Sequence, residues 1–157
     1  MTLDDLTVDF RHLDRRSLLQ EWEWLIGSTK LPILLTASGD AFVQDVEGGS
    51  VYVLDAGDGS IHQVASSLEN FQSLLGKRDF VASYFAVQMV GDLLAAGQRL
   101  SPGQIYSYKQ PLVLGGQCAL DNIERTDIAV HFSIAGQVHR QVSGLPAGTH
   151  IAGTSIA

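Results

Sequence analysis

The chain has 157 residues, 45% of them hydrophobic, and its 17 acidic and 10 basic residues give a net charge of −7. This length suits a single domain over residues 1–157 with its core at about residues 15–150, which folds without a metal or a disulfide. The acidic excess argues against direct nucleic-acid binding, which usually needs a basic surface.

The sequence also indicates a cytoplasmic protein. Its first residues, Met-Thr-Leu-Asp-Asp, are acidic and lack the apolar run of a signal peptide, so none is expected. No run of about 18 apolar residues occurs, so neither a membrane span nor a membrane partner is expected. Cys118 is the only cysteine, which excludes an internal disulfide and indicates a reducing compartment.

The chain begins with a lead-in segment, residues 1–13, and a helix is predicted after it. Asp14 is a suitable N-cap, and Gly27 fits the position just past the helix end. Between them, one apolar stripe recurs at helical spacing. Its members are Leu18, Leu19, Trp22, Leu25 and Ile26.

The next segments predict an antiparallel sheet. Gly48-Gly49 and Gly57–Ser60 are turn signals that separate short apolar runs. Three consecutive strands, at 41–46, 50–55 and 61–64, are therefore expected to form a meander. Residues 32–36 are a further short apolar run before it.

Two helices are expected after the sheet. Ser66 and Glu69 have the spacing of a capping box, which predicts a helix with Ser66 as N-cap that runs to Leu75. Asp79 is expected to cap a longer helix that continues to about Ala96.

The last third of the chain opens with a turn at 101–103 and an extended or irregular stretch to Leu120. Residues 126–143 then fit two patterns. Ile128, Val130, Phe132 and Ile134 alternate as in a strand, whereas a second set is spaced as in a helix. That set is Ile128, Phe132, Ala135, Val138 and Val142. We favour the helix because its stripe continues past Gly136 over several turns. The helix exit would be 145–148, and the small residues of 152–157 would form a flexible tail.

These elements predict the α+β class, with a mostly antiparallel sheet and helices packed against it. The long helical stripes at 79–96 and 128–142 are expected to cover one face of the meander.

Reactive residues do not form a catalytic or metal-binding pattern. His131 and His139 would lie about 12 Å apart along a helix axis, too far to bind one ion, and are interpreted as core-edge side chains that hydrogen-bond locally. Cys118 has no catalytic signature beside it and is interpreted as a small buried hydrophobe. No catalytic residue, metal site or cofactor is predicted. An enzyme or small-ligand binder would need a deep pocket in which such groups converge with perturbed pKa values.

Five acidic residues are expected at strand ends and turns: Asp40, Asp45, Glu47, Asp55 and Asp58. One interpretation is turn chemistry, because Asp side chains accept hydrogen bonds from nearby backbone. The other is an acidic rim that meets a basic protein. Trp24 lies off the apolar stripe that holds Trp22, so it either packs within the domain or anchors a partner.

A family resemblance is carried mainly by residues 106–149. The motifs are Tyr106-x-Tyr108-Lys109-x-Pro111, Leu114-Gly115-Gly116, Asp121-Asn122-Ile123, Val130-His131-Phe132-Ser133-Ile134, Gly136-Gln137-Val138-His139 and Leu145-Pro146-x-Gly148-Thr149. In these motifs the chain resembles the C-terminal domain of type VI secretion immunity proteins that neutralise DNase toxins. Residues 39–55 are similar to that domain too. The meander, followed by a helix of Ser-x-x-x-Phe type at Ser67–Phe71, more loosely resembles the SUKH superfamily of immunity and scaffold proteins. We expect this chain to lack the GAD-like N-terminal domain of larger family members.

The resemblance implies an immunity protein that binds a cognate secreted toxin, a type VI secretion DNase, and blocks its active site or DNA groove. Such a protein is not an enzyme. Because a nuclease groove is basic, an acidic protein is steered toward it. The candidate toxin-binding residues are Asp40, Asp45, Glu47, Asp55, Asp58 and Trp24. The alternative is a non-catalytic SUKH-like scaffold that binds a partner other than a toxin.

Overall fold

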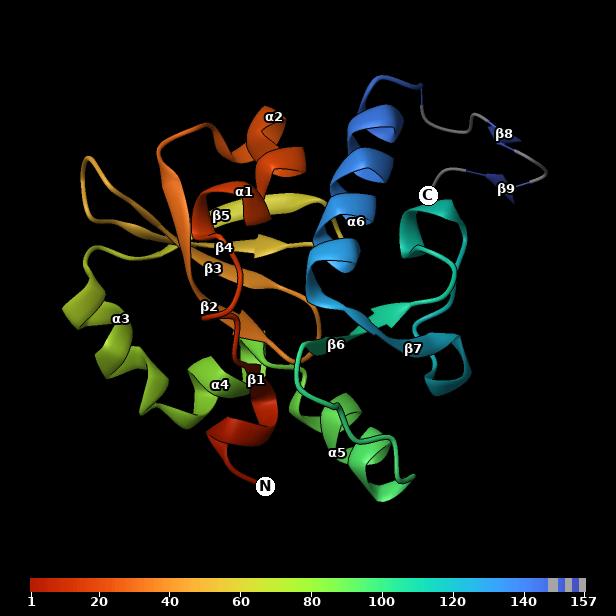
Figure 1. Ribbon diagram of the computed structural model, residues 1–157, viewed down its shortest axis with the longest axis horizontal. Helices are drawn as coiled ribbons and strands as arrows, with labels where there is room; N and C mark the ends of the chain where they lie inside the picture. Colours follow the sequence, from red (N-terminus) through yellow and green to blue (C-terminus); the bar gives the residue numbers. More distant parts are fainter. Residues whose placement is uncertain (147–149, 152–153, 156–157) are drawn as a thin grey trace.

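The computed structural model describes residues 1–146 together with the backbone of 150–151 and 154–155. A five-stranded antiparallel sheet lies at its centre, with helices on both faces and a two-stranded ribbon beside it (Figure 1). The predicted α+β class is therefore confirmed. Parts of the predicted helix exit and tail, at 147–149, 152–153 and 156–157, lie outside the described residues.

The central sheet is a meander with the strand order β1-β2-β3-β4-β5. The strands are β1 (Thr7–Val8), β2 (Lys30–Thr36), β3 (Ala41–Asp45), β4 (Val51–Asp55) and β5 (Ser60–Ala65). All neighbours are antiparallel, which confirms the meander predicted for residues 41–64. The first strand was missed because it has only two residues, although Leu6, Val8 and Phe10 alternate with polar residues around it.

Six α-helices lie in the described part of the chain: α1 (Arg15–Leu18), α2 (Glu23–Ile26), α3 (Leu68–Leu75), α4 (Arg78–Tyr84), α5 (Val87–Ala95) and α6 (Ile128–Ser143). Short 3-10 helices are η1 (Leu3–Leu6), η2 (Gln20–Trp22), η3 (Leu112–Leu114) and η4 (Leu120–Asn122). A ribbon pairs β6 (Gln104–Tyr108) with β7 (Ile123–Asp127), and β8 (His150–Ile151) pairs with β9 (Thr154–Ser155).

The first predicted helix is divided into α1, η2 and α2. Asp14 caps it as predicted, since its carboxylate accepts a hydrogen bond of 3.0 Å from the Arg16 backbone N–H. Gly27 ends it with a φ of +79°, a conformation that glycine adopts without strain.

The N-cap of α3 is Ser67, so the prediction of Ser66 is one residue early. The Ser67 hydroxyl accepts from the Asn70 N–H at 3.0 Å, and the Asn70 side chain accepts from the Ser66 N–H at 3.1 Å. Asn70 thus supplies the reciprocal bond that was expected from Glu69.

The prediction of a single helix from Asp79 to Ala96 is wrong. The helix is broken at Ala86, whose φ of +49° lies in the left-handed region, and the pieces are α4 and α5. Asp79 lies in the first turn of α4, and Lys77 is the N-cap. The break leaves Phe85 fully buried in the core, where its burial offsets the strain at Ala86.

The helix predicted for residues 126–143 is confirmed as α6. The Asp127 carboxylate caps it by accepting from the Val130 N–H at 3.0 Å. One face is buried at intervals of three to four residues, and Val130 and Ile134 lie exposed on the opposite side. The preceding strand, β7, was missed because its Ile-Glu-Arg-Thr-Asp sequence is mostly polar.

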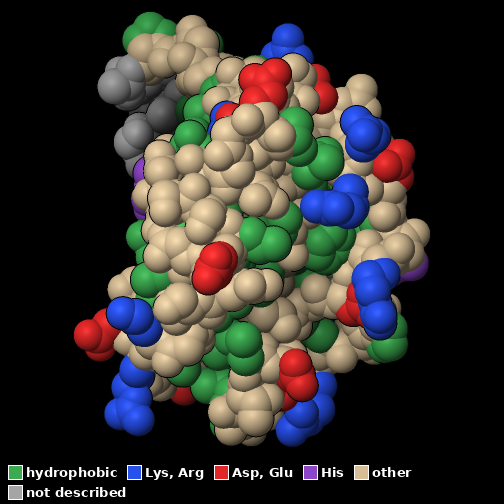
Figure 2. All heavy atoms as spheres, turned by 90° about the vertical axis from the view of Figure 1, so that its left-hand side faces the viewer, with side chains coloured by type: hydrophobic (Ala, Val, Ile, Leu, Met, Phe, Trp, Pro, Cys, Tyr) green, Lys and Arg blue, Asp and Glu red, His purple; other side chains and the backbone are tan. Residues whose placement is uncertain are grey.

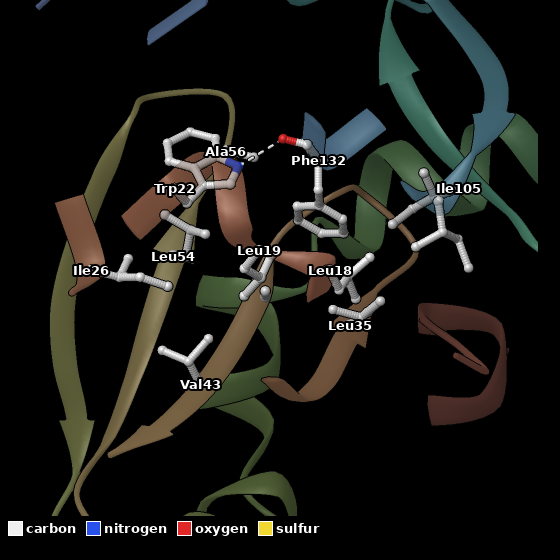
Figure 3. Packing of buried hydrophobic residues seen from close by; sticks show 12 residues of the cluster. Leu18, Leu19, Trp22, Ile26, Leu35, Val43, Leu54, Ala56, Ile105 and Phe132 are labelled. Carbon is white, nitrogen blue, oxygen red and sulfur yellow. Dashed lines mark hydrogen bonds between the residues drawn. The ribbon is translucent and has the colours of Figure 1, made fainter. Parts of the chain in front are cut away.

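The sheet separates two hydrophobic cores. Trp22, Leu35, Val43, Leu54 and Phe132 belong to the first, between the sheet and α1, α2 and α6 (Figure 3). The second core lies under α3, α4 and α5 on the other face (Figure 1). Its large members include Phe42, Phe71, Phe85 and Val90.

The expectation that the stripes at 79–96 and 128–142 share one face of the sheet is therefore wrong, since α5 and α6 lie on opposite faces. The reason is that neighbouring strand residues such as Phe42 and Val43 are both apolar and point to opposite sides. A sheet that is apolar on both faces needs helices on both faces.

Candidate functional site

The five predicted acidic residues lie at opposite ends of the sheet. Ala41 pairs with Leu54, so the β2–β3 turn and the β4–β5 turn share one end, whereas the β3–β4 turn lies at the other. About 16 Å of strand separates these ends. Asp40, Asp55 and Asp58 belong to the first end, and Asp45 and Glu47 belong to the second.

At the first end the structure forms a cleft of about 470 Å³, which we call the acidic cleft. Its walls are the two turns, the α4–α5 break and the segment from Tyr108 to Cys118. It is lined by Ser38, Asp40, Asp55, Gly57, Asp58, Ala86, Met89, Tyr108, Leu112, Val113 and Cys118. None of these lining residues, all in the described part of the chain, is a lysine or an arginine, so the cleft favours a cation.

Asp40 has a structural role within the acidic cleft. It is half-buried, and its carboxyl Oδ1 accepts a hydrogen bond of 2.9 Å from the Ala56 N–H, which ties the β2–β3 turn to the β4–β5 turn. The pKa of Asp40 is raised to about 8, first by burial and second by the neighbouring Asp55 carboxylate. The side chain is therefore mostly protonated at neutral pH and contributes little negative charge there.

The other acidic side chains also bond to turns. Asp55 Oδ1 accepts from the Asp58 N–H at 2.8 Å, and Asp45 Oδ1 accepts from the Glu47 N–H at 2.9 Å. The Glu47 N–H bond holds the pKa of Asp45 below its ordinary value. Turn chemistry thus accounts for Asp40, Asp45 and Asp55, while Asp58 and Glu47 remain exposed.

The surface beside α3 carries no strong single-sign patch. In Figure 2, which shows the left-hand side of Figure 1, acidic and basic side chains are interspersed with hydrophobic ones. The acidic cleft differs because its lining carboxylates have no basic side chain among them.

Trp24 packs within the domain. Its ring stacks on Trp22 with centroids 6.1 Å apart, and it is half-buried against the first core. Trp22 Nε1 donates to the Phe132 carbonyl at 2.9 Å (Figure 3), whereas Trp24 Nε1 is buried without an acceptor in the described part of the chain. Trp24 must therefore leave this stack to anchor a partner.

The two histidines of α6 bond to the turns of the acidic cleft. His131 Nε2 lies 2.8 Å from the Gly39 carbonyl, and His139 Nε2 lies 3.0 Å from the Ala56 carbonyl. Each ring must carry its proton on Nε2, since a carbonyl only accepts. Burial lowers the pKa of His131. The prediction of local hydrogen bonds is wrong, because both bonds join α6 to distant turns and fix it on the sheet.

Cys118 is exposed, so its predicted burial is wrong. Its Sγ lies 3.3 Å from the Tyr108 hydroxyl, and burial, followed by the contact with Cys118, raises the pKa of Tyr108. The irregular segment around Cys118 is held instead by Asn122, whose amide bonds to backbone atoms of Gln110 and Gln117 at 2.8–3.0 Å.

A second, smaller cleft of about 200 Å³ adjoins the acidic cleft, and we call it the apolar cleft. It shares Ser38, Gly57, Tyr108 and Leu112 with its neighbour. Its apolar lining includes Pro111 and Ile134, Ala135 and Val138 of α6, and Lys109 and Glu124 are the charged residues that line it. This cleft was not predicted from the sequence, although His131, Ile134, Ala135 and Val138 share one side of the predicted helix.

The two cleft residues with raised pKa values bond to other groups of the domain. Asp40 and Tyr108 have raised pKa values, but Asp40 bonds to a backbone N–H and Tyr108 to Cys118. Among the lining residues of the acidic cleft, all described, there is no histidine to act as a base for Cys118. Within the described residues, no group of three His, Cys, Asp or Glu residues is arranged to hold a metal ion. The described helices include none long and apolar enough to cross a membrane.

Comparison with known proteins adds the family. Residues 65–139 match the sequence model of the family described as T6SS immunity protein Tdi1, C-terminal. This match supports a type VI secretion immunity protein domain over these residues. The resemblance inferred from the sequence motifs is therefore confirmed over these residues, which run from the end of β5 to His139 of α6 and include the wall that both clefts share at Tyr108 and Leu112.

Among solved structures, the chain is similar to the crystal structure of Atu4351 from Agrobacterium tumefaciens, with a TM-score of 0.61 and 18% identity. The similarity covers 80% of this chain and 65% of that chain, which is less than two thirds of the other protein's length. At this identity it shows the shared fold alone. No curated protein matches the chain in sequence.

Proposed function

We propose that the protein is an immunity protein that acts in the cytoplasm, where it binds and neutralises a cognate toxin delivered by type VI secretion. The observation that carries this proposal is the family match over residues 65–139. The toxin is a DNase in this proposal, as the motif resemblance implies, and the protein acts by occupying its active site or DNA groove without catalysing a reaction.

Electrostatics supports a nuclease as the partner. A nuclease presents a basic groove to its polyanionic substrate, and this chain carries a net charge of −7. Complementary charge mainly accelerates encounter, whereas tight binding needs a desolvated cluster at the centre of the interface. The proposal therefore needs both exposed carboxylates and an apolar contact.

The candidate toxin-binding residues fall into two groups. Asp58 and Asp55 at the acidic cleft are the first choice, with Asp40 holding their turn in place through its bond to Ala56. Asp45 and Glu47 at the opposite end are the second group. Trp24 is an anchor only in a complex that rearranges its stack on Trp22.

The test is DNA cleavage by a purified type VI secretion DNase that co-purifies with the tagged protein, measured with increasing amounts of the protein. Cleavage should fall to background near a 1:1 ratio. Continued cleavage at a large excess of folded protein would contradict the proposal and favour the SUKH-like scaffold.

Stopped-flow association with the same toxin distinguishes the two acidic groups. Asp58→Asn and Glu47→Gln each remove one exposed charge, at opposite ends of the sheet. Asp58→Asn should slow association several-fold at low salt, with little effect near 1 M salt, where the Debye length is about 3 Å. A larger effect of Glu47→Gln would assign the interface to the second group.

A further inference from the structure

We propose that the apolar cleft and the acidic cleft form one docking groove for an extended protein segment that presents an apolar side chain beside a basic one. The proposal rests on the proposed function, because the segment is assigned to the toxin. It adds where the toxin binds and what chemistry is recognised.

The two clefts adjoin at one wall. Ser38 and Gly57 come from the two sheet turns, while Tyr108 and Leu112 come from the segment after β6, and all four line both clefts. A segment that crosses this wall therefore meets both environments within a few residues.

The apolar cleft has the size of one large side chain. Its volume of about 200 Å³ is below the ~300 Å³ at which pockets for drug-sized ligands begin. It exceeds the ~150 Å³ of a cavity that holds a benzene ring. It is therefore suited to an aromatic or large aliphatic side chain of a protein partner.

The rim of the apolar cleft is exposed. Ile134 is 54% exposed in the free protein, and it lines the cleft together with Ala135 and Val138 of the same helix. Covering this side chain would remove apolar surface from water, which favours binding.

The acidic cleft selects the neighbouring side chain. Asp55 and Asp58 line it, and no lysine or arginine is among its described lining residues, so a basic side chain of the partner finds carboxylates there without competition from this chain. An acidic side chain at the same place would be repelled. The charge of the occupant is thereby fixed as positive.

A direct test uses defined peptides and the full chain. Acetyl-Phe-Gly-Arg amide places both side chains on one side of an extended backbone, since alternate residues face the same way. In an NMR titration it should shift the amide signals of residues that line both clefts. Acetyl-Phe-Gly-Glu amide should bind at least several-fold more weakly.

Matched variants locate the effect on α6. Ile134→Asp should abolish the shifts, whereas Val130→Asp should leave them unchanged, because Val130 is 45% exposed on the same helix but does not line the cleft. Both positions are exposed, so both variants should fold, as circular dichroism verifies. Equal binding of the two peptides, shifts outside the clefts, or concentration-dependent shifts from self-association without peptide would overturn the proposal.

The toxin itself separates this inference from the proposed function. If the wild-type protein and Val130→Asp neutralise the toxin and Ile134→Asp does not, the docking groove and the immunity function are both supported. If Ile134→Asp neutralises as well as the wild type, the groove is wrong while the immunity function stands. If the wild-type protein does not neutralise, the immunity function fails, and binding of Phe-Gly-Arg still decides whether the groove recognises this chemistry.

Discussion

At the residue scale, the carboxylates of the sheet turns act as backbone acceptors before they act as surface charges. Asp40, Asp45 and Asp55 each accept a hydrogen bond from a backbone N–H of a turn. The pKa of Asp40 is raised because desolvation outweighs its hydrogen bond, whereas the hydrogen bond from the Glu47 N–H lowers the pKa of Asp45. One acidic residue thereby becomes sensitive to pH near neutrality.

Asp40→Asn should change how stability depends on pH. The ordinary pKa of the carboxyl is 3.8 and that in the folded protein is about 8, so the unfolded chain releases this proton first as pH rises. The free energy of unfolding should fall between about pH 4 and pH 8, by at most ~1.4 kcal/mol per pH unit. Asparagine keeps the acceptor for Ala56 and cannot ionise, so urea unfolding of the variant should show a weaker slope.

Asp45→Asn is the control for this experiment. The pKa of Asp45 is lowered, so its stabilising effect is present above its ordinary pKa and is lost only in acid. Between pH 5 and pH 8 this variant should keep the wild-type slope. An unchanged slope in Asp40→Asn would show that Asp40 is ionised in the folded protein.

Gly59→Ala should be much more damaging than Gly49→Ala. Both glycines have positive φ, at +74° and +80°, which costs an alanine about 1 kcal/mol. A Cβ at Gly59 would also overlap the His139 ring and disturb its bond to the Ala56 carbonyl, whereas at Gly49 the nearest atom is Gln44 Nε2 at 3.9 Å. The free energy of unfolding should fall by about 2–3 kcal/mol in Gly59→Ala and by ~1 kcal/mol in Gly49→Ala. Equal losses in urea unfolding would mean that the His139 contact adds nothing.

Residue patterns predicted local features better than distant ones. The cap at Asp14 and the stop at Gly27 follow from neighbours in sequence, and both are present. The exposure of Cys118 and the bonds of His131 and His139 depend on segments far away in the chain. Single-sequence periodicity carries no information on such contacts.

At the element scale, α6 is the helix that positions both clefts. Its histidines bond to the two turns, and Ile134, Ala135 and Val138 line the apolar cleft. Its close approach to η2 depends on Gly136, where an added Cβ would lie 2.7 Å from the Glu21 carbonyl oxygen. Because this oxygen belongs to the backbone, it cannot easily move to make room for the added Cβ.

Gly136→Ala should therefore destabilise the protein, although alanine normally favours a helix by about 1 kcal/mol over glycine. Displacing α6 from η2 should cost about 1–3 kcal/mol. Gly91→Ala in α5 is the matched control, since its Cβ would meet only the flexible end of Met1 at 3.6 Å. Thermal unfolding should show a lower Tm for the first and a slightly higher Tm for the second. A higher Tm for Gly136→Ala would refute the close approach.

Element boundaries were harder to predict than element types. Residues 79–96 and 128–143 were both identified as helical, but the break at Ala86 gives no sequence signal, because alanine is a good helix former. Only the packing of Phe85 and Val90 under the sheet explains the break. β7 was missed for a related reason. Its residues are mostly polar, and only the folded structure shows that they pair with β6.

At the scale of the whole molecule, the antiparallel class and the meander were predictable, but the placement of helices on the two faces was not. The sequence marks Phe42 and Val43, or Val53 and Leu54, as apolar neighbours, and only the fold shows which helix covers each side. The same limit applies to the candidate site. The acidic residues were identified, but their division between the two ends of the sheet depends on strand register.

The molecule as a whole is a three-layer scaffold that holds two adjoining clefts at one end of its sheet. Its net charge of −7 and the family match over residues 65–139 support the proposed basic toxin as partner. In our account, the charge accelerates the encounter, and the apolar cleft beside the acidic cleft supplies the specific contact.

The most direct test of this account is growth of cells that express the DNase toxin that co-purifies with the tagged protein, with and without the protein. We predict that the wild-type protein restores growth and that chromosomal DNA stays intact, whereas cells with the toxin alone lose both. Failure of the well-expressed, folded protein to protect the DNA or restore growth would contradict the account.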